Sequence, residues 1–169
     1  GKPNSDDTYR PERSLPSKKR VIIFSPHPDD DVISMGGTFD RLIQQGHEVH
    51  VAYHTSGNIA VNDSKVLEIT ELIRRIARSL NLSELNNLMS DEKNNLKKNH
   101  IIWADNFHQN INKLLTKEID YQGYKIVNRI KGIIRKSEAY QACRYLDLKD
   151  ESKIHYLDMP FYQTGKIKK

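Results

Sequence analysis

Two different periods of apolar residues follow one another in the first third of the chain. Residues 21–24 form a continuous apolar run, which is typical of a short strand buried on both faces. From Val32 the spacing becomes helical, and one apolar face is made of Val32, Met35, Phe39, Leu42 and Ile43. Gly46 then marks a helix end, and residues 47–53 alternate as a second strand does. We therefore predict a strand–helix–strand unit over residues 21–54 with parallel strands.

The remaining pattern predicts more helix than strand. Residues 64–82 keep a heptad-like spacing that core packing explains, and residues 83–123 predict only helical pieces and loops. Residues 125–146 predict another helix, and residues 153–157 predict a third strand. The side chains expected to face inward on these two helices are Val66, Ile69, Ile73, Ile76, Leu80, Ile126, Ile130, Ile133, Ile134, Ala142 and Leu146. The order of elements predicts an α/β fold, in which ligands bind at the carboxyl ends of parallel strands.

Composition narrows the class of protein. The chain has 169 residues, enough for one ordinary domain, and no apolar run approaches the roughly 20 residues of a membrane helix. Its single cysteine cannot form a disulfide within the chain, which favours a cytoplasmic protein. Residues 1–20 have no apolar stretch and predict a linker rather than a signal peptide. The net charge is +5, but no aromatic residues interleave with the lysines, so we expect no nucleic-acid partner.

The segment SPHPDDDVISMGG, residues 25–37, carries the candidate chemistry. It places His27 and three consecutive aspartates, Asp29, Asp30 and Asp31, at the carboxyl end of the first predicted strand. Imidazole and carboxylate groups are a good ligand set for zinc or another divalent metal. A neighbouring carboxylate could accept a proton from a metal-bound water. The pattern is therefore compatible with a metal-dependent hydrolase.

Two other interpretations of the aspartates stay open at this point. Asp30 or Asp31 could simply be the N-cap of the following helix and complement its dipole. A magnesium-dependent phosphoryl-transfer site also uses aspartates after the first strand of such a sheet. That class of site alternates its aspartates and needs no histidine, so His27 argues against it.

Residues 25–57, SPHPDDDVISMGGTFDRLIQQGHEVHVAYHTSG, resemble the LmbE/PIG-L family of zinc-dependent N-deacetylases. The shared features are the His-Pro-Asp-Asp motif after a strand, a helix with two glycines, a Gly-His turn and a second strand ending in Thr-x-Gly. The stretches RKSEAYQACRYLDL and IHYLDMPFYQTG resemble the variant found in some bacteria behind a glucosamine-6-phosphate deaminase-like domain. The resemblance implies a three-layer Rossmann-like parallel sheet with helices on both faces. It further implies a domain over residues 21–169 with a helical insertion at about 59–124, and an upstream deaminase-like domain on the same chain.

The resemblance also implies a substrate and a role for each site residue. The substrate would be a small amino sugar of the N-acetylglucosamine type, from which an N-acetyl group is removed. The implied roles are zinc ligands for His27 and Asp30, general base for Asp29, orientation for Asp31, sugar contact for Arg135, and pocket border for Thr55, Gly57 and Asn58. Asp31 departs from the family pattern, because the family usually has Glu there.

A second departure concerns the third zinc ligand, which in the family is a histidine in a downstream H-x-x-H segment. Residues 47–50 spell H-x-x-H, but side chains three apart in a strand point to opposite faces. His54, at the end of the second strand, is the in-chain candidate. We therefore expect a domain truncated on its C-terminal side. The alternative function is a non-catalytic module that serves assembly or sugar binding beside a deaminase-like protein, and a homo-oligomer is also compatible with the sequence.

Overall fold

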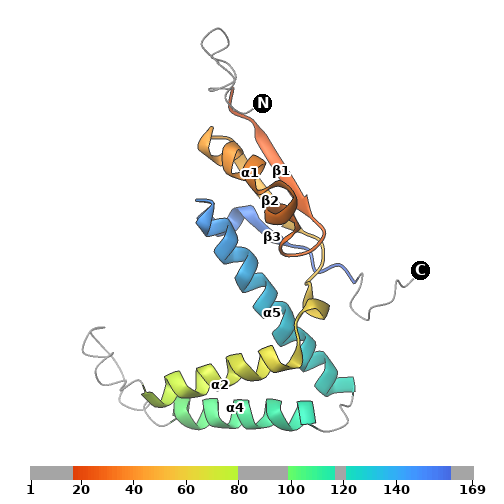
Figure 1. Ribbon diagram of the computed structural model, residues 1–169, viewed down its shortest axis with the longest axis vertical. Coiled ribbons are helices and arrows are strands. Elements are labelled where there is room, and N and C mark those ends of the chain that lie inside the picture. The colour runs from red at the N-terminus through yellow and green to blue at the C-terminus, as the bar shows by residue number, and fades with distance from the viewer. Residues whose placement is uncertain (1–16, 80–98, 117–120, 161–169) are drawn as a thin grey trace. The chain divides into compact units, whose positions relative to one another are not determined.

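The chain divides into two compact units in the computed structural model, which describes residues 17–79, 99–116 and 121–160 (Figure 1). One unit is Gly1–Asn58 with Gly132–Lys169, and the other is Ile59–Lys131. The second unit begins where the predicted insertion begins and ends at Lys131 rather than near residue 124. Most of the predicted linker, residues 1–16, lies outside the described residues.

The first unit contains a parallel sheet of three strands. They are β1 (Arg20–Ser25), β2 (Glu48–Tyr53) and β3 (Ile154–Tyr156), in the order β1-β2-β3. Both neighbouring pairs are parallel, with Arg20 opposite Glu48 and Val51 opposite Ile154. The predicted α/β class and the parallel strand–helix–strand unit are therefore confirmed. Arg20, which the sequence placed in the linker, already belongs to β1.

The helix between β1 and β2 is α1 (Asp30–Gln44). It ends as predicted, because Gly46 adopts a φ of 73° directly after the C-cap residue Gln45. Its N-cap is Asp29, and that residue makes no side-chain capping bond. The interpretation of Asp30 or Asp31 as the N-cap is therefore wrong, because both already lie within the helix.

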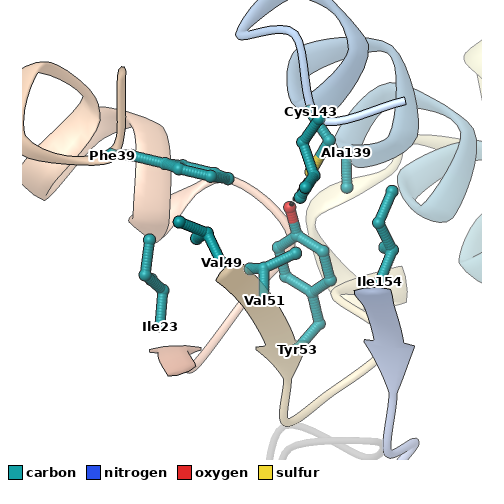
Figure 2. Packing of buried hydrophobic residues seen from close by; sticks show 9 residues of the cluster. Ile23, Phe39, Val49, Val51, Tyr53, Ala139, Cys143 and Ile154 are labelled. Carbon is teal, nitrogen blue, oxygen red and sulfur yellow. Dashed lines mark hydrogen bonds between the residues drawn. The ribbon is translucent and has the colours of Figure 1, made fainter. Parts of the chain in front are cut away.

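The core of the first unit lies on one face of the sheet (Figure 2). Its buried members are Ile23, Phe39, Val49, Val51, Tyr53, Ala139, Cys143, Leu148 and Ile154. Phe39 comes from α1, whereas Ala139 and Cys143 come from α5 (Tyr121–Tyr145). Both helices thus pack on the same side of β2, whose alternation was predicted correctly.

The opposite face of β1 is exposed, with Ile22 at 57% and Phe24 at 62% of their full accessibility. The prediction that β1 is buried on both faces is therefore wrong for the part of the chain that the structure describes. The physical reason is that α1 and α5 both cover the face of Ile23. Helices on the second face, which the resemblance implied, are not among the described residues of this unit.

The buried side of α5 differs from the predicted one. Ile126 and Ile133 are exposed, although Ile134 is buried as expected. The buried residues of α5 in the sheet core are Ala139 and Cys143, near the end of the helix, and Leu146, just after the helix, packs against this core as predicted. Small side chains such as those of Ala139 and Cys143 let the helix backbone approach the sheet closely. The prediction relied mainly on large apolar residues and therefore missed these two. A short 3-10 helix, η3 (Glu151–Lys153), connects the end of this helix to β3.

The second unit contains α2 (Asp63–Ser79), α4 (Asn99–Thr116) and the first turns of α5, and η2 (Asn58–Ala60) precedes α2. Val66 is buried as predicted, whereas Ile76 is 44% exposed and Leu80 lies outside the described residues. The two helices are joined by a hydrogen bond between Thr70 Oγ1 and His108 Nδ1 at 2.9 Å. No described helix is both long and apolar enough to cross a membrane.

Candidate active site

His27 and Asp30 meet in the turn that follows β1. The Nδ1 atom of His27 lies 2.8 Å from Oδ2 of Asp30, and the same oxygen accepts the His27 backbone N–H at 3.0 Å. Both side chains are partly open to solvent, at 44% and 35%. An imidazole nitrogen and a carboxylate oxygen at one accessible point are suitable zinc ligands. The two residues therefore fit two positions of a metal site.

A third ligand is not supplied by the described residues. Within them, no group of three or more His, Cys, Asp or Glu side chains is arranged to hold a metal ion. His54, the predicted in-chain candidate, therefore does not complete the site. Its ring packs 5.4 Å from the ring of Phe24. His47 accepts a hydrogen bond from the backbone of Lys19, in keeping with its exclusion from the site.

Asp29 pairs with Arg135 on α5. One guanidinium nitrogen of Arg135 lies 2.8 Å from Asp29 Oδ2, and another lies 2.7 Å from Glu138 Oε2. The Arg135 side chain is only 14% exposed, and its buried Nε has no hydrogen-bond partner. Asp29 and Asp30 are thus adjacent in sequence but are held by different partners. Sugar contact by Arg135 stays a prediction, whereas its contact with Asp29 is present in this structure.

Gly57 is required by the close packing around this ion pair. Its φ is 63°, a left-handed conformation that favours glycine. A Cβ atom at this position would lie 2.7 Å from Cδ of Pro28 and 3.3 Å from Nε of Arg135. The residue therefore lies against the motif, but it does so through its backbone.

Thr55 and Asn58, the other predicted border residues, are nearly buried, at 7% and 6% exposure. Thr55 Oγ1 donates to the carbonyl of Pro26 at 2.8 Å, and Asn58 Oδ1 accepts from Ser56 Oγ at 3.0 Å. The hydroxyl of Thr55 thus supports the turn that carries His27. A border role in a substrate pocket stays a prediction for both residues.

Asp31 is buried, at 2% exposure, and its orienting role stays a prediction. The Tyr53 hydroxyl donates to its Oδ2 at 2.8 Å, and Ser25 Oγ lies 3.3 Å from its Oδ1. The Tyr53 oxygen also lies 3.3 Å from Cys143 Sγ, and Figure 2 shows this oxygen directed toward α5. Burial raises the pKa of the Tyr53 hydroxyl, and it raises the pKa of the Cys143 thiol to about 11.

Ser25, Tyr53 and Cys143 were not identified as site residues from the sequence. One signal was available for Tyr53, because it falls on the same face of the alternating segment 47–53 as Val49 and Val51, and a buried carboxylate needs hydrogen-bond donors. The contact with Cys143 had no such signal, because it joins residues 90 positions apart.

The family profile for PIG-L, described as GlcNAc-PI de-N-acetylase, matches residues 22–169. The chain belongs to the PIG-L family. A glucosamine-6-phosphate deaminase-like protein from Bacteroides thetaiotaomicron is 49% identical over 171 residues, which is 100% of this chain and 23% of that protein. A PIG-L relative named diacetylchitobiose deacetylase, from Thermococcus kodakarensis, is 31% identical over 67 residues. That match covers 40% of this chain and 25% of the relative.

The PIG-L chain therefore spans about a quarter of each of these relatives. No solved structure gives a significant match. The matched range includes the whole His-Pro-Asp-Asp motif, β2, α5 and β3. The resemblance found in the sequence and the Rossmann-like α/β fold that it implied are thus confirmed.

Proposed function

We propose that this PIG-L domain carries part of a metal-dependent de-N-acetylase site for amino sugars of the N-acetylglucosamine type. The observation that supports it most is the contact between His27 Nδ1 and Asp30 Oδ2 at 2.8 Å, next to a separately held Asp29. The family description and the name of the Thermococcus relative both refer to removal of acetyl groups from such sugars.

In this proposal His27 and Asp30 hold a zinc ion together with a ligand from outside the described residues. Zinc bound there would polarise the amide carbonyl and make a bound water a stronger acid. Asp29 would take a proton from the attacking water, whose oxygen would bond to the amide carbonyl carbon. Asp29 would then pass the proton to the amide nitrogen as the C–N bond breaks, which releases acetate and the free amino sugar. Because Arg135 holds Oδ2 of Asp29, the proton would be taken at Oδ1. Arg135 thereby fixes the direction in which the base points.

A second candidate is a non-catalytic module for assembly or sugar binding. It is favoured by one observation: the chain corresponds to 23% of a protein whose name refers to a deaminase rather than to a deacetylase. The same observation supports a covalent link to a deaminase-like domain that handles related amino sugars. Cytoplasmic location, the absence of a nucleic-acid partner and a homo-oligomeric state stay predictions.

The test uses the complete encoded protein and measures both zinc affinity and amine release from N-acetylglucosamine-type substrates. Asp29→Asn should lower kcat by about 10²–10⁴-fold, because the base is lost, and should retain zinc, because Asp29 is not one of the proposed ligands. The same change also removes the negative charge that pairs with Arg135. His27→Ala should lose zinc and activity together. His54→Ala is the matched control, since it removes a histidine at the end of the neighbouring strand.

Full activity in Asp29→Asn would exclude Asp29 as the base. A wild-type protein that neither binds zinc nor releases amine would support the non-catalytic module. Zinc loss in His54→Ala would identify His54 as a ligand in solution and contradict the arrangement described above.

A further inference from the structure

The interior side of the motif contains a hydrogen-bonded chain that the proposed chemistry does not use. It runs from Cys143 on α5 through Tyr53 on β2 to Asp31 in the first turn of α1. We infer that the Tyr53 hydroxyl is a positioning group, which fixes Asp31 and thereby the segment that carries His27 and Asp30. This inference rests on the proposed function for its effects on zinc binding and catalysis, whereas its effect on hydrogen exchange does not.

The segment of the proposed ligands is held at both ends. At its start, Ser25 Oγ donates to the His27 carbonyl at 2.6 Å and accepts the Asp31 backbone N–H at 3.0 Å. At its end, the Asp31 side chain accepts a hydrogen bond from the Tyr53 hydroxyl on β2. The residues that would bind metal lie between these two attachments. A shift of Asp31 would therefore move Asp30, which is its direct neighbour.

The distances show which donor Asp31 depends on. Ser25 has one hydroxyl proton, and it is directed at the His27 carbonyl at 2.6 Å rather than at Asp31 Oδ1 at 3.3 Å. The Tyr53 hydroxyl approaches Asp31 Oδ2 at 2.8 Å and is therefore the principal side-chain donor to this carboxylate. The N-terminal dipole of α1 supports the same negative charge.

The contact with Cys143 follows the direction of the hydrogen bonds in this series. The single proton of the Tyr53 hydroxyl is directed at Asp31 Oδ2 at 2.8 Å, so in the 3.3 Å contact between Tyr53 and Cys143 the thiol is the donor. Asp31 and Tyr53 would thus orient the residues that bind metal. In metalloproteins, loss of a group that orients the metal ligands typically lowers metal affinity or activity by about 10–100-fold.

The test compares two Tyr→Phe variants of the complete encoded protein. Tyr53→Phe removes the hydroxyl that binds Asp31. Tyr156→Phe removes a hydroxyl that donates to the carbonyl of Lys136 at 2.9 Å, from a ring that stacks on Tyr53. The second change is matched in size and place but does not touch the motif. Zinc affinity and hydrogen exchange of the amides of residues 27–33 are measured for each.

We expect Tyr53→Phe to weaken zinc binding by about 10-fold or more and to speed exchange in residues 27–33. Tyr156→Phe should leave zinc affinity and the exchange of residues 27–33 unchanged, even if it lowers the melting temperature as much as Tyr53→Phe does. Asp31→Asn should reproduce the loss, and the double variant with Tyr53→Phe should lose little more than either single variant. Equal effects in the two tyrosine variants, or additive losses in the double variant, would overturn the inference.

The exchange measurement separates this inference from the proposed function. If the wild-type protein releases no amine, faster exchange in Tyr53→Phe alone would still support the positioning role. If it is an active deacetylase and Tyr53→Phe changes neither exchange nor zinc affinity, the positioning role is wrong and the proposed function stands.

Discussion

The glycine at position 57 offers the sharpest test of the packing around the motif. Gly57→Ala introduces a Cβ at a φ of 63° and 2.7 Å from Cδ of Pro28. A left-handed conformation costs a residue with a Cβ about 1–2 kcal/mol. Insertion of a methyl group into a filled space adds about 1–3 kcal/mol, because the neighbours must move. The free energy of unfolding should therefore fall by about 2–5 kcal/mol.

Gly46→Ala is the matched control, because it carries the backbone penalty without the collision. Gly46 has a φ of 73°, and a Cβ there would meet only the end of Lys18 at an ordinary 3.7 Å. Urea unfolding of both variants should show about 1–2 kcal/mol for Gly46→Ala and a larger loss for Gly57→Ala. Equal losses would mean that Pro28 and Arg135 do not crowd Gly57, and the account of the site would be wrong.

Two further predictions concern the core. Phe39→Ala should lower the free energy of unfolding by about 3–5 kcal/mol, because Phe39 is fully buried. Phe24→Ala, on the exposed face of β1, should change it by less than about 0.5 kcal/mol. Comparable losses for the two variants in urea unfolding would contradict the assignment of the two faces. The free energy of unfolding should also fall as the pH rises from about 9 to about 11. The pKa of the Cys143 thiol is about 11 in the folded state and lower in the unfolded state, so the protonated thiol stabilises the folded state fully below about pH 9 and progressively less above it. Cys143→Ala should flatten this decline, and an unchanged slope in urea unfolding across that pH range would contradict it.

Local signals in the sequence were enough for the strand–helix–strand unit. The change of period at Val32 and the glycine at position 46 marked the elements around α1 correctly. They did so because each is set by neighbouring residues and the period of the backbone. The motif also gave His27 and Asp30 as a pair, and the structure brings these two side chains into contact.

The contacts across the first unit could not be read from local pattern. Ile133 satisfied the helical period but lies on the exposed side of α5, whereas Cys143, with a smaller side chain, faces Tyr53. The pairing of Asp29 with Arg135 joins the turn after β1 to α5, more than 100 positions later in the chain, and no local period encodes such a contact. Asp31 was interpreted as an N-cap or, by resemblance, as an orienting residue, and its burial could not be predicted because it depends on a tyrosine from another strand.

One helix reaches two of the three aspartates, through Arg135 to Asp29 and through Cys143 and Tyr53 to Asp31. Positions 135 and 143 are about 12 Å apart along a helix axis, and each added residue would turn one of them by about 100° relative to the other. A single insertion or deletion between them would therefore remove one contact whenever the other was kept. The two contacts therefore depend on the number of residues between positions 135 and 143 as well as on the side chains at these positions, and proteins that share both contacts should have no insertion or deletion between them.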